Sequence, residues 1–407
     1  MTVDFQINNS ADPLARFVGW APAPCRLRMT NPAGATSPAV QVRITSTSAA
    51  GGGGGVGVAA PGGAFSNSVT LTVPTNGASV PFFIAGRFGS PSANIGDVGV
   101  EGRVGPALVG STSLMVRIRK NANQLTAAER DRLVAAFAQL NNQGLGRFTD
   151  FRDMHTSAGS SQGHGAPGFL PWHRAYLLDL ERELQAIDPS IALPYWRFDQ
   201  PAPNLFTRDY FGESDENGTV RFGAANPLQF WRTDGVQGIT RQPFFPTNAA
   251  PSGLRSEAQT LALGSQYAAF RTLEFNPHGS AHTSFDGFIS SIDTAARDPL
   301  FFLLHCNVDR LWAKWQRQFG RFDASQPASF ENSAGFPVGH RLADTMWPWN
   351  GITGGSRPPT APGGALATSP CVAAPGAQPR VADALDYQGR LNAAARMGFD
   401  YDDVPFG

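Results

Sequence analysis

Residues 151–183 read FRDMHTSAGSSQGHGAPGFLPWHRAYLLDLERE, and residues 274–312 begin with EFNPHGSAHTS and end with DPLFFLLHCNVDRLW. Six of the seven histidines of the chain lie in these stretches as two groups of three: His155, His164 and His173, and then His278, His282 and His305. Imidazole is the commonest metal ligand in proteins. Two matched sets of three nitrogen ligands therefore predict two metal ions side by side, each with open positions for small molecules.

The local sequence predicts which of these histidines lie on helices and which lies in a loop. His278 and His282 are four residues apart, which on a helix puts them on one face, one turn apart. His173 follows Pro171 at the start of another predicted helix. His164 is separated from that helix by glycines and prolines, so we expect it in a loop.

A further helix is expected to carry the last histidine. Asp298 predicts its N-cap and Pro299 its first residue, and an apolar run continues through Trp315. Asp309 lies four residues after His305, on the same face. Its carboxylate is expected to accept a hydrogen bond from a ligand imidazole or an adjacent arginine and to fix the orientation of that group.

The ligand type narrows the choice of metal. Sites made of imidazoles alone suit copper, zinc, iron or nickel. The Glu-x-x-His pairs of di-iron bundles are absent, no bridging carboxylates for zinc are evident, and the three cysteines are far apart in the sequence. The pattern therefore favours two copper ions that bind dioxygen. His340 stands apart from both groups, and we expect it to be a structural or exposed residue.

Several motifs resemble those of the tyrosinase and catechol oxidase family, its bacterial members in particular. The sequence FLPWHR at residues 169–174 resembles the first copper site of the family, and residues 298–312 resemble its second. The resemblance extends over about residues 121–407 and also takes in these short motifs: Asn276-Pro277-His278, Leu193-Pro194-Tyr195-Trp196 and Met346-Trp347-Pro348-Trp349-Asn350.

This resemblance implies a fold and an activity. The implied fold is a mainly α-helical core whose four-helix bundle holds a dicopper centre. The implied activity is the oxidation of o-diphenols to o-quinones by dioxygen, with hydroxylation of monophenols as a further reaction. A hemocyanin-like dioxygen carrier with little turnover is the alternative, and whatever covers the coppers would discriminate between the two.

The resemblance also implies roles for four residues beside the substrate. Glu274 is expected to hold a water or take a phenol proton, although pairing with Arg271 is the alternative. Ile292 occupies the position over the first copper that sets access, unless it is a core residue. Gly279 stands where hydroxylating members often carry Asn, and Thr283 is the corresponding residue after the next histidine. Gly279 therefore predicts that catechol oxidation exceeds monophenol hydroxylation.

At 407 residues the chain is long enough for more than one domain, and its composition predicts a multidomain protein. Residues 1–120 are rich in Gly, Ser, Thr, Val and Pro, and contain alternating runs such as residues 40–44, which predict a small antiparallel β-sandwich. Gly51 to Gly55 are expected to form a flexible loop. Thr126 begins a capping box and a helix, so the dicopper domain is expected to span residues 121–407.

The remaining features limit the partners and the location. The formal charge is zero without a basic stripe, so nucleic acid is not expected. No run of about 20 apolar residues predicts a membrane span. The N-terminus does not resemble a signal peptide, so a cytoplasmic protein is expected, with export on a partner as the alternative. The expected partners are a phenolic small molecule and dioxygen, and the sequence does not indicate an oligomeric state.

Overall fold

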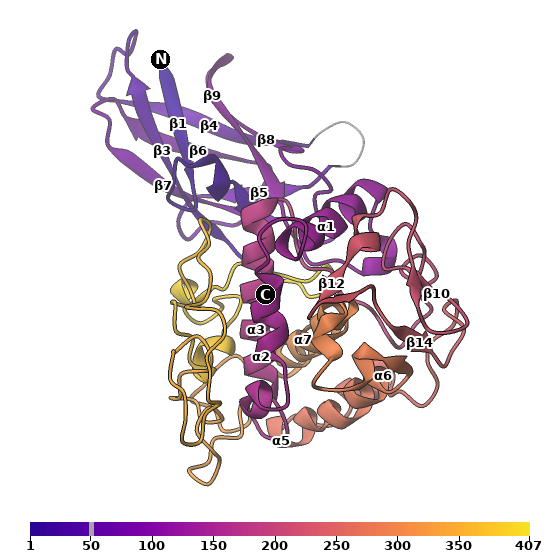
Figure 1. Cartoon of the computed structure of the whole chain (residues 1–407). Helices are drawn as coiled ribbons and strands as arrows, with labels where there is room; N and C mark the ends of the chain where they lie inside the picture. Colours follow the sequence, from indigo (N-terminus) through magenta and orange to yellow (C-terminus); the bar gives the residue numbers. More distant parts are fainter. Residues whose placement is uncertain (49–52) are drawn as a thin grey trace. The chain divides into compact units, whose positions relative to one another are not determined.

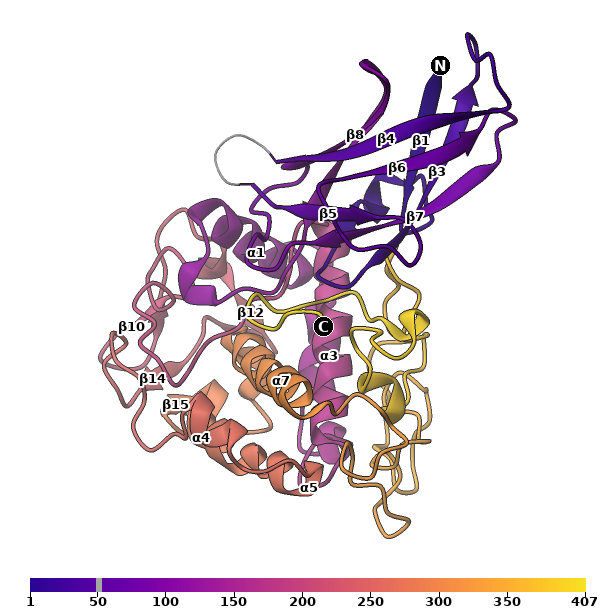
Figure 2. The ribbon, with the colours of Figure 1, turned by 180° about the vertical axis from the view of Figure 1, so that it is seen from behind.

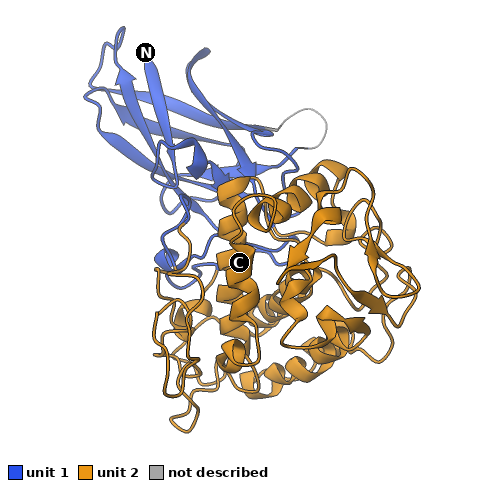
Figure 3. Ribbon diagram, in the orientation of Figure 1, with its two compact units in different colours: residues 1–118, 369–374, 388–407 blue, residues 119–368, 375–387 orange. Residues whose placement is uncertain are grey.

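The computed structural model describes residues 1–48 and 53–407, which form two compact units (Figure 3). Unit 1 contains Met1–Ile118, Ser369–Ala374 and Gln388–Gly407, and unit 2 contains Arg119–Thr368 and Pro375–Tyr387. Of the predicted glycine loop, Gly51 and Gly52 lie outside the described residues. None of the helices in the described part of the chain is both long and apolar enough to cross a membrane.

Unit 1 is built from two β-sheets (Figures 1 and 2). One has the strand order β1-β3-β7-β5 and the other β2-β9-β8-β4-β6, and the single parallel pair among these is β2 with β9. The strands are β1 (Thr2–Ile7), β2 (Phe17–Val18), β3 (Ala23–Asn31), β4 (Ala39–Ser48), β5 (Val56–Ala59), β6 (Ser68–Pro74), β7 (Ser79–Gly86), β8 (Val98–Val104) and β9 (Ala107–Val116).

The core of unit 1 follows from the two-residue period of its strands. In β3, Cys25, Leu27 and Met29 are buried, whereas Arg26 and Arg28 between them are exposed. Successive side chains of a strand point to opposite faces, so one face of each sheet is apolar and packs inward. The alternation in the sequence is therefore the physical origin of this core.

The C-terminal residues of unit 1 are held by buried hydrogen bonds. The carboxylate of Asp400 accepts from the backbone N–H of Trp20 at 2.8 Å and from Gln388 at 2.7 Å. The indole of Trp20 donates to the carbonyl of Tyr401 at 2.8 Å. Buried polar groups are costly unless paired, so these bonds fix the chain end within the unit.

Unit 2 contains seven α-helices and three two-stranded sheets among its described residues. The helices are α1 (Ala127–Leu140), α2 (Phe148–Met154), α3 (Phe169–Ile187), α4 (Glu257–Leu261), α5 (Tyr267–Phe270), α6 (Ser280–His282) and α7 (Leu300–Phe319). The strands are β10 (Glu213–Ser214), β11 (Val220–Arg221), β12 (Arg232–Thr233), β13 (Val236–Gln237), β14 (Arg241–Pro243) and β15 (Phe285–Gly287).

The expected core with a four-helix bundle is not confirmed. Only α1, α3 and α7 exceed ten residues among the described helices. The segment around His278 is a π-helix, Phe275–Gly279, followed directly by the short α6. Asn276 inside it has extended angles (φ −143°, ψ 121°), and Pro277 has no N–H to donate. A regular helix therefore cannot run through this segment.

Helix ends agree with the sequence to within a residue or two. Thr126 and Glu129 form the predicted capping box of α1. Helix α7 begins at Leu300, and the predicted capping pair precedes it: Asp298 is extended (φ −94°, ψ 118°) and Pro299 already has helical angles (φ −62°, ψ −16°). The carboxylate of Asp298 accepts the N–H of Leu300 at 3.0 Å, so Asp298 caps the helix as predicted. The helix continues past the predicted apolar run to Phe319.

Helices α3 and α7 lie side by side and are joined by buried charges (Figures 1 and 2). Asp309 on α7 accepts from Arg174 Nε on α3 at 2.6 Å and from Arg119 Nη1 at 3.2 Å. Arg119 also donates to Glu181 on α3 at 3.0 and 2.7 Å. Of the two partners expected for Asp309, the structure gives it arginines, and these side chains are at most 2% exposed.

We expect Asp309→Asn to lower the free energy of unfolding by about 3–5 kcal/mol, because it leaves two buried guanidinium groups without a full counter-charge. Urea unfolding checks this value. The control is Asp131→Asn, at an exposed position of α1, which should stay within about 0.5 kcal/mol of the wild type. An equally small effect at Asp309 would contradict the role given to this network.

Candidate metal centre

The first triad comes from three separate local structures. His155 ends α2, and His173 lies on the second turn of α3. His164 lies in a loop after the short 3₁₀ helix Gly159–Gln162, as the surrounding glycines and prolines predict. Each residue offers a ring nitrogen, and these nitrogens lie within 4.8 Å of one another.

The second triad comes from the broken helical segment and from α7. His278 lies in the π-helix, His282 ends α6, and His305 lies in the second turn of α7. Their ligand nitrogens are also within 4.8 Å of one another. The structure thus brings together all six histidines that the sequence singles out, in the two groups that it predicts.

Backbone carbonyl groups fix the tautomers of five of these rings. The Nδ1 atoms of these five histidines lie 2.7–3.3 Å from carbonyl oxygens. Because a carbonyl can only accept, each of these Nδ1 atoms carries the proton. The pairs are His155 with Ile292, His164 with Ser160, His173 with Phe169, His278 with Glu274 and His282 with Ile289.

The Nε2 atoms of these five rings are consequently left with bare lone pairs. The Nε2 atoms of His155 and His173 are 3.4 Å apart, and neither has a proton to share. In the second triad, the Nε2 atoms of His278 and His282 lie 3.2 and 3.1 Å from that of His305. Converging lone pairs repel unless a cation lies between them, so the triads fit metal ions.

Burial keeps these imidazoles neutral. Desolvation lowers the pKa of each of the six, and for most of them the neighbouring histidines lower it further. The pKa of His282 falls to about 4. Only a neutral imidazole can coordinate a metal, so both triads are ready for ligation at neutral pH.

The two triads are in direct contact through their rings. The rings of His173 and His305 stack at a centroid distance of 4.2 Å and an angle of 12°. Phe301 on α7 packs against both His305 (4.2 Å) and His155 (4.4 Å). Stacked rings from α3 and α7 therefore place the two candidate metal positions next to each other, as the sequence predicts.

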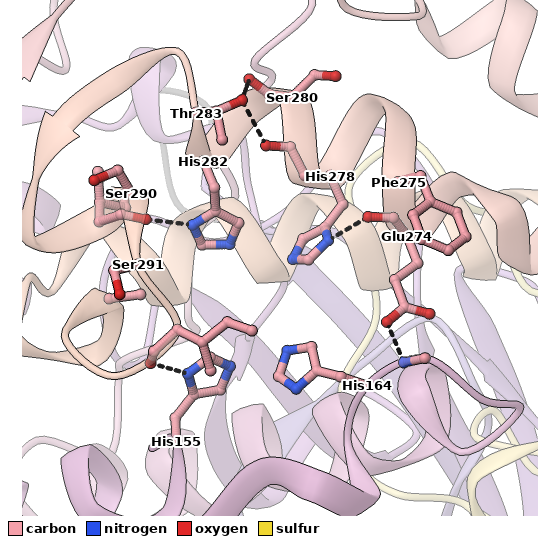
Figure 4. A pocket seen from close by; sticks show the side chains of 15 residues that line it. His155, His164, Glu274, Phe275, His278, Ser280, His282, Thr283, Ser290 and Ser291 are labelled. Atoms are coloured by element: carbon pink, nitrogen blue, oxygen red, sulfur yellow. Dashed lines mark hydrogen bonds between the residues drawn. The ribbon is translucent and has the colours of Figure 1, made fainter. Parts of the chain in front are cut away.

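A cavity of about 550 Å³ lies directly over the histidines (Figure 4). In this view the rings of His278 and His282 face those of His155 and His164 across a common space. The cavity opens to solvent, because among its lining residues Phe275 is 69% exposed. A small molecule can therefore reach both triads directly.

Glu274 lines the cavity and has one unused oxygen atom. Its Oε1 accepts the backbone N–H of Gly165 at 2.6 Å, while its Oε2 is buried without a hydrogen-bond partner. Burial raises the pKa of this carboxyl to about 7. The alternative partner, Arg271, is instead bonded to Glu331 at 2.7 Å. Glu274 is thus placed to accept a proton or bind water in the cavity.

The three other expected substrate-side residues also line this cavity. Ile292 is 45% exposed, so it is no core residue, and its carbonyl orients His155. Gly279 has ordinary helical angles, and a Cβ added there would meet only the carbonyl of Glu274, at 3.4 Å. Thr283 donates to the carbonyl of Gly279 at 3.0 Å. The cavity thus has room for a side chain at position 279.

Sequence reasoning missed several contributors to the site. Phe275, Ser280, Ser290 and Ser291 line the cavity, and the N–H of Gly165 holds Glu274. The single available signal was their position next to predicted ligands or access residues. The N–H of Gly165 is a backbone group, so the identity of its side chain could not reveal the contact with Glu274.

The comparisons with known proteins can now be set beside this geometry. Residues 145–318 match the common central domain of tyrosinase. The tyrosinase of Streptomyces glaucescens is 35% identical over 264 residues, which cover 57% of this chain and 92% of that protein. The tyrosinase of Streptomyces antibioticus is 32% identical over 273 residues, with 58% and 94% covered. The chain belongs to the tyrosinase family.

More distant proteins are also similar to this chain. A hemocyanin of Enteroctopus dofleini is 29% identical over 229 residues, which cover 49% of this chain and 7% of that protein. Among solved structures, a polyphenol oxidase variant from Thermothelomyces thermophila has a TM-score of 0.49 at 17% identity, with 70% of this chain and 88% of that chain covered.

The histidine outside both triads, His340, is bonded to the start of α3, the helix that carries His173. His340 is buried, and its Nδ1 accepts the N–H of Gly168, at the start of α3, at 3.1 Å. This agrees with the structural role expected for it. Burial lowers the pKa of His340 from its ordinary value of 6.5 to about 4.

This pKa shift predicts a loss of stability in mild acid. Because the folded-state pKa lies below the ordinary value, the contribution is present above about pH 6.5 and is lost as the pH falls towards 4. Between pH 7 and 5 the free energy of unfolding should fall by about 1–2 kcal/mol more in the wild type than in His340→Gln, whose amide oxygen accepts without titrating. Urea unfolding at both pH values measures this, and equal losses would refute it.

Proposed function

We propose that this member of the tyrosinase family holds one copper ion in each histidine triad and oxidises o-diphenols to o-quinones with dioxygen. The family makes the chain a dicopper phenol oxidase. The observation that carries the ligand assignment is the convergence of Nε2 atoms in both triads, which are unprotonated at the five rings whose Nδ1–H is bonded to a carbonyl. When bound, the copper pair supplies the redox chemistry, in which one dioxygen is reduced to two waters as two catechols lose two electrons each.

The open cavity favours an oxidase over a carrier. A carrier needs its metals closed off from phenols, whereas here a cavity of about 550 Å³ reaches the histidines from solvent. All six histidines lie in unit 2, so we assign catalysis to this unit and to the predicted domain of residues 121–407. The centre is then held by four helical segments, α2, α3, the π-helix with α6, and α7, in place of four long helices.

Three lining residues are proposed to act on the substrate. Glu274 takes the phenol proton, directly or through a water, because it lines the cavity and burial raises the pKa of its carboxyl to about 7. Ile292 sets the width of the entrance, because its exposed side chain borders the cavity beside the first triad. Thr283 borders the entrance from the side of the second triad.

Gly279 makes catechols the better substrates. A phenol hydroxyl with a pKa near 10 must lose its proton to bind a metal well. A side-chain amide at position 279 would orient a water shared with Glu274, but glycine offers none. A catechol brings a more acidic hydroxyl and two donor oxygens, so it depends less on that water. Catechol oxidation should therefore clearly exceed monophenol hydroxylation.

Replacing one ligand tests the copper assignment. We expect His173→Ala to lower the copper content from about two ions per chain to about one and to abolish catechol turnover, because it leaves two ligands in the first triad. Metal analysis of the purified protein and a catechol assay measure this. His340→Gln is the matched control and should keep both coppers. Full copper and full activity in His173→Ala would rule out the assignment.

Gly279→Asn tests the substrate preference. The ratio of tyrosol hydroxylation to oxidation of the corresponding catechol should rise about tenfold, because the new amide can orient a water beside Glu274. A Cβ at position 279 would meet only the carbonyl of Glu274, at 3.4 Å. Gly376→Asn, at an open position outside the cavity, should leave the ratio unchanged. A wild type that hydroxylates tyrosol as fast as it oxidises the catechol would contradict the proposal.

A further inference from the structure

A second hollow lies beside the cavity over the histidines. It has a volume of about 270 Å³ and is bordered by Phe244, Phe245, Ser252 and their neighbours. Ser280 and Thr283 line both hollows, so the two are separated by little more than one helical turn. An apolar cavity of about 150 Å³ is enough to hold benzene. The second hollow is larger and open, and four hydroxyl-bearing residues line it besides its two phenylalanines.

Both walls of the second hollow are tied to the segment that carries His278 and His282. On one side, the N–H of Phe244 donates to the carbonyl of Ser284 at 2.9 Å, two residues after His282. On the other side, Asn276 Nδ2 donates to the carbonyl of Gly253 at 2.9 Å, two residues before His278. These two hydrogen bonds therefore fix the position of the hollow relative to the second triad.

The aromatic rings of this wall have different surroundings. Phe245 packs into a cluster, with its ring 5.2 Å from that of Phe285 and stacked on Trp196 at 6.4 Å and 13°. Phe244, the next residue, is 68% exposed and borders the hollow. An exposed aromatic ring beside the cavity offers a face on which another ring can pack.

The charge of the lining restricts what can bind. Among the described residues that border either hollow, none is Lys or Arg, and Glu274 is the one carboxylate. Away from the metal positions, a substrate carboxylate would find no cationic side chain in the lining to pair with, and burying it unpaired is costly. The hollows therefore suit an uncharged molecule.

We infer that the second hollow is a subsite for a second aromatic ring, and that the preferred substrates are neutral phenols that carry such a ring on a short link. This inference rests on the proposed function, since the phenol end reacts at the histidines. The distal ring packs on Phe244 while the catechol oxygens reach the metal positions. Phe244 is thus a positioning residue for specificity and takes no part in the oxidation.

The test compares one-ring and two-ring substrates. For the copper-loaded wild type, kcat/KM for 4-(2-phenylethyl)catechol should exceed that for catechol by about tenfold, mainly through a lower KM, because the added ring gains one aromatic contact and buries its surface. Phe244→Ala should remove this preference and leave catechol turnover unchanged. Phe230→Ala is the matched control, because Phe230 is also largely exposed (56%, against 68% for Phe244) and borders neither hollow.

A second variant and a binding measurement distinguish the loss of the subsite from misfolding of the protein. Ser252→Trp fills the hollow from the opposite wall and should also remove the preference. Calorimetry of the copper-loaded protein under nitrogen should show that 4-(2-phenylethyl)phenol binds about tenfold more weakly to Phe244→Ala than to the wild type. The anionic 3-(3,4-dihydroxyphenyl)propionate should react less efficiently than 4-ethylcatechol.

The outcomes separate the two proposals. Equal kcat/KM for the one-ring and two-ring catechols in the wild type, or a preference that survives both variants, would overturn the subsite. Equal rates for the propionate and 4-ethylcatechol would overturn the preference for neutral substrates. A copper-loaded protein that oxidises no catechol would refute the proposed function, while the calorimetric result would still decide whether the second ring binds beside Phe244.

Discussion

The interaction on which the whole centre depends is the hydrogen bond from an imidazole Nδ1–H to a backbone carbonyl. It recurs at five of the six histidines and fixes which nitrogen keeps its proton. Each bond turns a bare Nε2 inward, against the repulsion of the other lone pairs. The fold keeps these lone pairs close together although they repel one another, and a bound metal ion would remove the repulsion.

Rigid helices keep these rings from moving apart. His173 and His305 stack between α3 and α7, and the same helices are joined by Asp309 and its arginine partners. The ion network itself contacts no substrate. It sets the distance between the helices, and that distance sets the spacing of the two triads. The network is therefore linked to function through geometry.

The sequence predicts the ligands well because their chemistry resides in side chains. Imidazoles in groups of three can be recognised by residue type, and the capping box at Thr126 follows from hydroxyl and carboxylate spacing. The carbonyls of Ile289 and Ile292 could not be predicted, because every residue has one. The helical segment expected over His278 and His282 is present, but spacing could not predict that its first turn is a π-helix. The C-terminal segments of unit 1 depend on long-range contacts that no local pattern records.

We claim that two metal ions occupy the two triads side by side, and X-ray diffraction from copper-loaded crystals at the copper absorption edge is the direct test. We predict two anomalous peaks per chain, one among His155, His164 and His173 and the other among His278, His282 and His305. A single peak, or copper bound by other residues, would contradict the claim.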